Sequence, residues 1–202
     1  MDALLTGTDI NKIQKAIHKK YKQVAKNPAG LFKYSTGRAG LKALKYPSEL
    51  INALPEVVAE SYCGVGNPFA LGPIKHGEAV LDIGCGSGVD VMFAAIMSGP
   101  SGKVTGIDVT PQMLKRATEN LALTDFQNIR FEQAAADNLP FTDQNFNVII
   151  SNGAFNLVPD KSGGFSEAFR VLKHGGRLMI ADQILIGELP KEKKEIIKSW
   201  SR

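Results

Sequence analysis

The chain has 202 residues and a formal net charge of +4, with 44% hydrophobic and 22% charged residues. This length and composition are typical of a globular protein with one full core, formed by one domain or by one domain with an appendage. No apolar run is long enough to span a membrane, and the N-terminus lacks the apolar core of a signal peptide. We therefore expect a cytoplasmic protein without a membrane partner.

Charge is distributed unevenly along the chain. Residues 1–47 contain ten lysines and arginines but only Asp2 and Asp9, a net charge of +8, so the remaining residues carry −4. A basic segment of this kind attracts nucleic acid, an anionic lipid surface or an acidic partner, and it also occurs as a plain solvated helix face. The two cysteines, Cys63 and Cys85, are not spaced as metal ligands, so we expect no metal site.

The N-terminal segment begins with an amphipathic pattern. Ile10, Ile13, Ile17 and other apolar residues recur at helical spacing, which predicts a helix over residues 9–25 with Thr8 or Asp9 as its N-cap. A lone helix of this length is marginal in water, so we expect it to pack on the main domain. A role as a lid or as a partner-binding helix stays open.

The next stretch has weaker signals. Residues 35–38 resemble a turn, residues 40–45 a short helix and residues 47–60 a second helix. Residues 61–68 follow as a glycine-rich loop, which either closes over a ligand or is a plain connector.

An apolar run then enters three evenly spaced glycines, Gly84, Gly86 and Gly88, which predicts a strand, a tight turn and a helix start. A dinucleotide fingerprint spaces its third glycine differently and receives a pyrophosphate. Asp82 at the end of the strand would repel phosphate, whereas through water or amides it can hold the ammonium group of an amino-acid-like ligand. S-adenosylmethionine has that shape and charge, so we predict it as the cofactor.

A second acidic residue supports this interpretation. Asp108 ends the predicted strand over residues 103–108, and a carboxylate there can accept hydrogen bonds from both hydroxyls of a ribose. The alternative is a structural glycine turn followed by a solvated aspartate.

The rest of the chain alternates helices and strands. Thr110-Pro111 is a typical helix start, and the run from Ala134 to Ala136 allows a flat ring to approach, with Asp137 able to accept from an exocyclic amine. The predicted strands cover residues 129–133, 146–151 and 177–181; the predicted helices cover residues 89–97, 111–121, 166–172 and 190–200, with a stop at 173–176.

These elements predict an α/β, Rossmann-like, doubly wound and mostly parallel sheet with an N-terminal helical extension. The run 80–90, the segments 106–110 and 137–141, and the run 170–176 resemble the class I S-adenosylmethionine-dependent methyltransferases. The segments 151–152, 156–161 and 64–66 are similar to the arsenite methyltransferase branch of that family.

The resemblance implies a set of cofactor-binding residues. Gly84, Cys85 and Gly86 would approach the methionine part, and Asp108 would bind the ribose. Val109 would flank the adenine, with Ala136 and Asp137 facing its edge. Asn152 would lie near the sulfonium.

The chain departs from that branch in two ways. Arsenite enzymes hold arsenic on cysteines, but the matching positions here are Val65 and Gly153, so the resemblance does not extend to arsenite as the acceptor. Relatives also continue beyond the fifth strand into an antiparallel hairpin, which is missing here. We expect either an open sheet edge, which a second copy can cover as a homodimer, or a fragment of a longer protein.

We therefore expect a basic extension or lid over residues 1–73 and a cofactor-binding methyltransferase domain over residues 74–202. The favoured hypothesis is in-line methyl transfer to a small molecule, with no residue identified as a catalytic base. One alternative is a nucleic-acid methyltransferase that binds phosphates with the basic arm, although the chain lacks interleaved aromatic residues. The other is an inactive cofactor-binding or partner-binding module.

Overall fold

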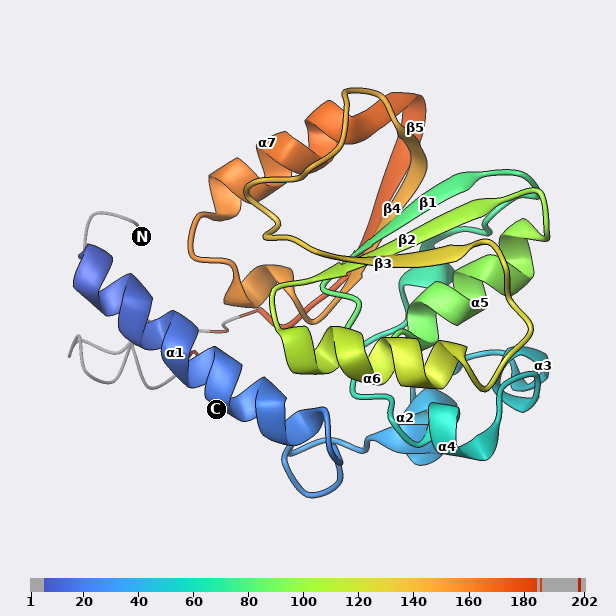
Figure 1. Ribbon diagram of the computed structural model, residues 1–202, viewed down its shortest axis with the longest axis horizontal. Coiled ribbons are helices and arrows are strands. Elements are labelled where there is room, and N and C mark those ends of the chain that lie inside the picture. Colours follow the sequence, from blue (N-terminus) through green and yellow to red (C-terminus); the bar gives the residue numbers. More distant parts are fainter. Residues whose placement is uncertain (1–5, 185, 187–199, 201–202) are drawn as a thin grey trace.

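A computed structural model describes residues 6–184, 186 and 200. Its centre is one sheet of five parallel strands in the order β3-β2-β1-β4-β5, which confirms the predicted Rossmann-like α/β fold (Figure 1). The strands are β1 (Ala79–Ile83), β2 (Lys103–Asp108), β3 (Ile129–Gln133), β4 (Phe146–Asn152) and β5 (Leu172–Ala181).

Helices cover both faces of the sheet. The helices α5 (Val89–Ser98) and α6 (Pro111–Leu121) pack on one face, and α7 (Lys161–Val171) packs on the other (Figure 1). The strand order reverses between β1 and β4, because the chain runs outward to β2 and β3 and then returns to the other side of β1. In open α/β sheets this switch point is where ligands bind.

The two faces of β1 belong to different cores. Leu81 and Ile83 pack toward α7 with Ile149, while Val80 packs toward α5 with Val104. Because β1 is central and buried on both faces, its apolar run is almost continuous. This rigid centre fixes where Asp82 and the glycine turn emerge.

The N-terminal segment contains α1 (Gly7–Val24) and three short helices, α2 (Gly37–Ala43), α3 (Ser48–Asn52) and α4 (Glu56–Ala59). The predicted first helix is confirmed, but its predicted cap is wrong. Thr6 is the N-cap and forms a capping box with Asp9, which follows it by three residues. The hydroxyl of Thr6 accepts from the amide of Asp9, and the carboxylate of Asp9 accepts from the amide of Thr6. Ile13 and Ile17 are buried, so α1 packs on the main domain.

Two further predictions need correction. The helix expected over residues 47–60 is interrupted, because Pro55 has no amide hydrogen and begins a new helix, α4. The turn expected at residues 35–38 holds the start of α2 at Gly37.

The boundaries of α7 and β5 differ from those predicted. Helix α7 begins at Lys161 instead of residue 166, since the side chain of Asp160 caps it by accepting from the amide of Gly163 at 2.8 Å. Strand β5 begins at Leu172, and the predicted helix stop at residues 173–176 forms a register shift within that strand. Gly175 adopts a φ of 74° there, a conformation that favours glycine.

The helix predicted over residues 190–200 lies outside the described residues except for Trp200. Among the helices that the structure describes, none combines the length and the apolar character needed to cross a membrane.

Candidate functional site

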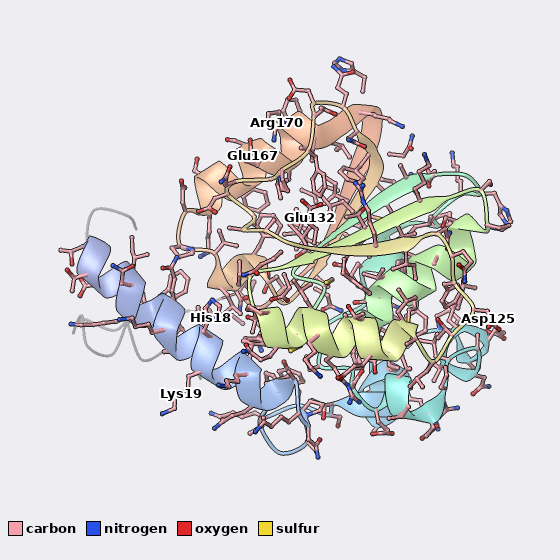
Figure 2. The ribbon with its side chains drawn as sticks, viewed as in Figure 1. His18, Lys19, Asp125, Glu132, Glu167 and Arg170 are labelled. Carbon is pink, nitrogen blue, oxygen red and sulfur yellow. The ribbon has the colours of Figure 1, made fainter. Side chains whose placement is uncertain are left out.

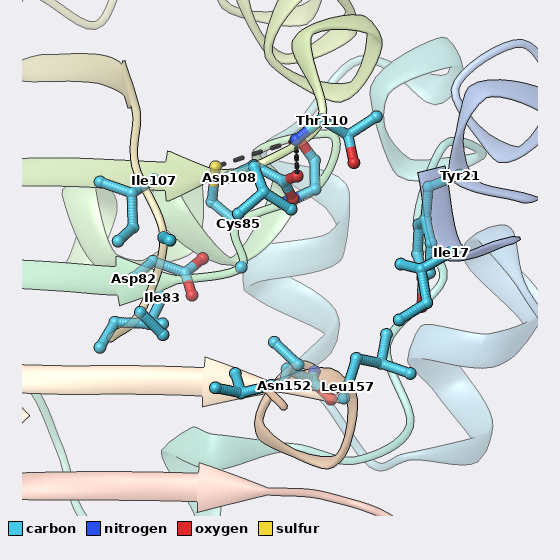
Figure 3. A pocket seen from close by; sticks show the side chains of 18 of the residues that line it. Ile17, Tyr21, Asp82, Ile83, Cys85, Ile107, Asp108, Thr110, Asn152 and Leu157 are labelled. Atoms are coloured by element: carbon cyan, nitrogen blue, oxygen red, sulfur yellow. Dashed lines mark hydrogen bonds between the residues drawn. The ribbon is translucent and has the colours of Figure 1, made fainter. Parts of the chain in front are cut away.

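A cavity of about 600 Å³ opens at the carboxyl ends of β1, β2 and β4. Figure 3 shows Asp82, Asp108 and Asn152 at these strand ends, with Ile17 and Tyr21 of α1 on the opposite side. Nine of the predicted cofactor-binding residues line it: Asp82, Gly84, Cys85, Gly86, Asp108, Val109, Ala136, Asp137 and Asn152.

The glycine turn is held by backbone hydrogen bonds. The amides of Gly84 and Cys85 both donate to the carbonyl oxygen of Ile107, at 2.9 and 2.8 Å. Gly84 has a φ of 77°, and a Cβ atom at this position would overlap the methyl group of Ala154. The turn after β1 is therefore pressed against the turn after β4, and only glycine fits between them.

Gly88 is the tenth predicted residue, and it does not line the cavity. It has a φ of 84° at the start of α5, where a Cβ atom would lie 2.9 Å from the ring of Phe131 and 3.2 Å from Ala117. Glycine is needed at this position for the helix start and its packing on neighbouring elements.

The carboxylate of Asp108 faces the glycine turn. Its Oδ2 atom accepts from the amide of Gly86 at 3.0 Å, and its Oδ1 atom accepts from the amide of Thr110 at 2.8 Å. Each carboxylate oxygen has a further lone pair, so Asp108 can still accept two hydroxyl groups from a ligand. Enclosure by protein raises the pKa of Asp108, and the two amides oppose this effect.

Two more carboxylates lie beside Asp108. Asp82 is only 2% exposed, and burial, together with the charges of Asp90 and Asp108, raises its pKa well above the ordinary value. Burial also raises the pKa of Asp90 to about 6. Like charges held together in an enclosed site favour a cationic ligand, which relieves their repulsion.

Small apolar side chains form another part of the cavity lining. Val109 is 40% exposed in spite of its apolar side chain, and Ala136 is buried. Asp137 follows Ala136, is exposed and also lines the cavity. Small side chains leave space for a planar ring, and the carboxylate of Asp137 can accept a hydrogen bond from the edge of such a ring.

Asn152 connects the cavity to the loop of residues 64–66. Its Oδ1 atom accepts from the amides of Val65 and Gly66 at 2.9 and 3.0 Å, and its Nδ2 atom lies 2.9 Å from Oδ2 of Asp90. Tyr46 donates to the other oxygen of Asp90 at 2.8 Å. The polar atoms of Asn152 therefore anchor this loop at the end of β4.

The network around Asn152 contains residues at the cavity to which the sequence analysis assigns no role. Asp90 belongs there only to the run 80–90 and to the predicted helix over residues 89–97, and Tyr46 and Tyr62 are not among the predicted site residues. Tyr62 lines the cavity and donates to the hydroxyl of Tyr46 at 3.2 Å. Local patterns carry no signal for these contacts, because their partners are distant in the sequence.

Helix α1 supplies another missed part of the wall. Its lining side chains are Asn11, Gln14, Lys15, Ile17, His18 and Tyr21. Figure 2 shows His18 on the side of α1 that faces the domain and Lys19 on the outer side. The apolar face of the helix predicted that α1 packs on the domain, but it did not predict that α1 lines the cavity.

Val65 and Gly153, the positions that match the arsenic-binding cysteines of the arsenite methyltransferase branch, lie next to each other. A Cβ atom on Gly153 would be 3.2 Å from a methyl group of Val65. Cys63 lines the same cavity, but burial and the charge of Asp108 raise its pKa to about 12, so it is a neutral thiol at physiological pH. The cavity thus has no pair of thiolates at these positions.

The residues present fit S-adenosylmethionine. The glycine turn, Asp82 and Asp90 line the same cavity, where a bound cation would favour the charged form of both carboxyl groups, and Asp108 offers acceptors for a diol. A cavity of this volume is within the range of small-molecule sites.

Comparisons with known proteins agree with this fit. Residues 74–202 match a family model described as a methyltransferase domain. The chain is 38% identical to an arsenite methyltransferase from Halobacterium salinarum over 78% of its length and 40% of the relative's. It is 31% identical to a demethylmenaquinone methyltransferase from Lactobacillus johnsonii, over 68% of the chain and 62% of that protein.

A solved structure is also similar. The crystal structure of an arsenic(III) S-adenosylmethionine methyltransferase from Chlamydomonas reinhardtii has a TM-score of 0.61 and 35% identity, covering 67% of this chain and 48% of that one. The chain thus spans between 40 and 62% of the length of these three relatives. On its family match, fold and cavity, the chain belongs to the class I S-adenosylmethionine-dependent methyltransferases.

Proposed function

We propose that this chain binds S-adenosylmethionine at the carboxyl ends of β1, β2 and β4 and transfers its methyl group to a small molecule. The observation that carries the proposal is the group of three carboxylates, Asp82, Asp90 and Asp108, which line one cavity together with the glycine turn. The family assignment supports the same cofactor.

Each residue has a distinct task in this proposal. Asp82 holds the ammonium group through water or backbone amides, Asp108 accepts the ribose hydroxyls, and Val109 and Ala136 flank the adenine. Asp137 accepts from the exocyclic amine. The cofactor supplies an already activated methyl group, so the protein mainly aligns the acceptor and excludes water.

The acceptor in this proposal lies between α1 and the segment after β4. Ile17 and Tyr21 line one side of the cavity, and Leu157, Val158 and Pro159 line the other. These side chains favour an acceptor with an apolar body over an inorganic ion. Trivalent arsenic needs soft thiolate ligands, and Val65 and Gly153 provide none.

Transfer of labelled methyl groups from S-adenosylmethionine tests this proposal. With a quinol, a phenol and arsenite as acceptors, we expect label in an organic acceptor and none in arsenite above the level without protein. The variant Asp108→Asn is the control for dependence on the cavity. Methylation of arsenite by the unaltered chain would contradict the assignment of the acceptor.

A second candidate is methylation of nucleic acid, and the exposed lysines of α1 favour it. They are spaced by three and four residues and so form one row along the helix: Lys12, Lys15, Lys19 and Lys22. Lys15 also lines the cavity. If four phosphates bind this row, the affinity for single-stranded RNA falls with salt with a logarithmic slope of about −3. Filter binding at two salt concentrations measures this slope, and no retention at low salt removes the candidate.

A further inference from the structure

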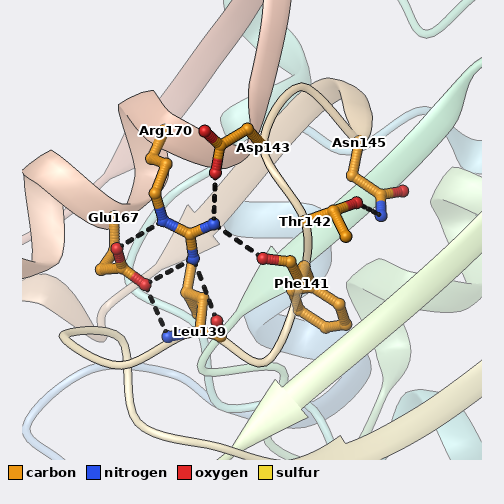
Figure 4. Close-up of polar contacts among 7 residues, drawn as sticks. All are labelled: Leu139, Phe141, Thr142, Asp143, Asn145, Glu167 and Arg170. Carbon is orange, nitrogen blue, oxygen red and sulfur yellow. Dashed lines mark hydrogen bonds and ion pairs between the residues drawn. The ribbon is translucent and has the colours of Figure 1, made fainter.

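Arg170, in the last turn of α7, joins this helix to the segment that follows β3 (Figure 4). Its Nη1 atom donates to the carbonyl oxygen of Phe141 at 2.7 Å and to Asp143 at 2.8 Å, and its Nη2 atom donates to the carbonyl oxygen of Leu139 at 3.0 Å. Its Nε and Nη2 atoms also donate to the two oxygens of Glu167, both at 2.7 Å. All five N–H groups of the guanidinium therefore have an acceptor.

Glu167 completes the connection from the other side. Its Oε2 atom accepts from the amide of Leu139 at 2.9 Å while it is paired with Arg170. The backbone of Leu139 is thus held by Glu167 at its amide and by Arg170 at its carbonyl oxygen. A bidentate ion pair of this kind has a fixed planar geometry, which a lysine cannot reproduce.

The segment held in this way forms part of the cavity. Ala134, Ala135, Ala136 and Asp137 line it, and Leu139 follows Asp137 by two residues. Between them, the amide of Asn138 donates to the carbonyl oxygen of Ala135 at 3.2 Å, which closes a tight turn. Leu139 is therefore joined to the rim at Asp137 by a short stretch of backbone that a hydrogen bond closes into a turn.

We propose that Arg170 and Glu167 are a positioning pair that fixes the wall formed by residues 134–137, and through it the affinity for the cofactor. Neither side chain lines the cavity, so both act through the backbone of Leu139 and Phe141. The effect on the cofactor rests on the proposed function, whereas the effect on the wall itself does not.

A second ion pair provides a matched control. Arg177 donates to both oxygens of Glu78 at 2.7 Å and to the carbonyl oxygen of Pro73, and its side chain is 31% exposed compared with 32% for Arg170. This pair joins β5 to the residue before β1, at the amino end of that strand, whereas the cavity opens at the carboxyl ends of the strands. Neither Arg177 nor Glu78 lines the cavity.

Calorimetry with S-adenosylmethionine tests the pair. For Arg170→Gln we expect at least a tenfold increase in the dissociation constant, and for Arg177→Gln less than a twofold increase at a comparable loss of melting temperature. Arg170→Lys should not restore binding. Equal weakening by both Gln variants would overturn the proposal, because the effect would then follow general stability.

A double-mutant cycle separates positioning from a purely structural role. If Arg170 acts through the rim, Arg170→Gln and Asp137→Asn have less than additive effects on the dissociation constant, whereas Arg177→Gln and Asp137→Asn are additive. Additive effects in both cycles would contradict the proposal.

Hydrogen exchange of the ligand-free protein tests the wall without the cofactor. Arg170→Gln should speed exchange of the amides of residues 135–139 at least tenfold, and Arg177→Gln should leave them unchanged. If the unaltered protein binds no S-adenosylmethionine, the proposed function fails while this result still decides the role of Arg170. Unchanged exchange in Arg170→Gln would overturn the positioning role.

Discussion

At the scale of residues, the cavity depends on carboxylates from three different elements: Asp82 lies in β1, Asp90 in α5 and Asp108 at the end of β2. Asp82 and Asp108 belong to adjacent predicted strands, and Gly84 and Gly86 follow the first of them, so their meeting at one sheet edge could be predicted from the sequence. Asp90 could not be assigned in this way. Its partners Tyr46 and Asn152 are 44 and 62 residues away, and no local pattern encodes such contacts.

The first residue-scale prediction concerns Asp108. Asp108→Asn keeps the size of the side chain but removes its charge and half of its acceptor capacity. We expect the affinity for S-adenosylmethionine to fall about 100-fold, equivalent to about 3 kcal/mol for weakened charge-assisted hydrogen bonds. Asp125→Asn, at an exposed position after α6, is the control (Figure 2). Equal affinities for the two variants, measured by calorimetry, would contradict the role of Asp108.

The second residue-scale prediction concerns pH and Asp90. Burial raises its pKa to about 6 in the folded protein, against an ordinary value near 4. The folded state therefore binds the proton more tightly than the unfolded state, so this group's contribution to stability is present at pH 4 and is lost as the pH rises through 6. The charge of the folded carboxylate costs stability at neutral pH.

Urea unfolding of the unaltered protein and of Asp90→Asn measures this contribution. The unaltered protein loses the contribution of Asp90 as the pH rises, whereas the variant has no titrating group at this position. The difference in the free energy of unfolding between the unaltered protein and the variant should therefore fall by roughly 2 kcal/mol between pH 4.5 and pH 7.5. A deficit that is constant over this range would show that the carboxylate titrates near its ordinary value.

At the scale of elements, the strands and the longer helices followed the periodicity of the sequence, whereas short helices did not. The segment 47–60 has helical spacing throughout, but Pro55 divides it. In α7 the predicted helix was too short. Gly163 and Gly164 have low helix propensity, so the helix was predicted to begin at residue 166, whereas Asp160 caps it and it begins at Lys161. Capping and bulges depend on single side chains, so boundaries were harder to predict than the elements themselves.

Helix α1 gives the prediction at this scale. It covers one side of the cavity and is held through buried Ile13, Ile17 and Val24. Ile13→Ala removes a fully buried side chain, at a typical cost of about 2–5 kcal/mol, and so favours opening of this helix. We expect S-adenosylmethionine to dissociate at least tenfold faster, as measured by stopped-flow fluorescence.

The control for α1 is Ile51→Ala. Ile51 is 1% exposed in α3 and does not line the cavity. Its loss should lower the melting temperature without a comparable change in the dissociation rate. If the two variants release the cofactor equally fast, α1 is not a lid.

At the scale of the whole molecule, the strand order explains where the site lies. Alternating strands and helices predicted a doubly wound sheet, and the reversal between β1 and β4 places the two turns that enclose the cavity side by side. The division at residues 73 and 74 and a homodimer through the β5 edge stay predictions. Relatives extend well beyond the length of this chain, so its acceptor had to be inferred from the side chains of the cavity alone.

Calorimetric titration of the folded chain with S-adenosylmethionine and with its demethylated product tests the cavity most directly. We predict binding of both at one site per chain. The sulfonium compound should bind more tightly and should lose that advantage in Asp90→Asn, because the carboxylates favour its extra positive charge. Absence of binding to either compound by a folded protein would contradict the assignment of this cavity to the cofactor.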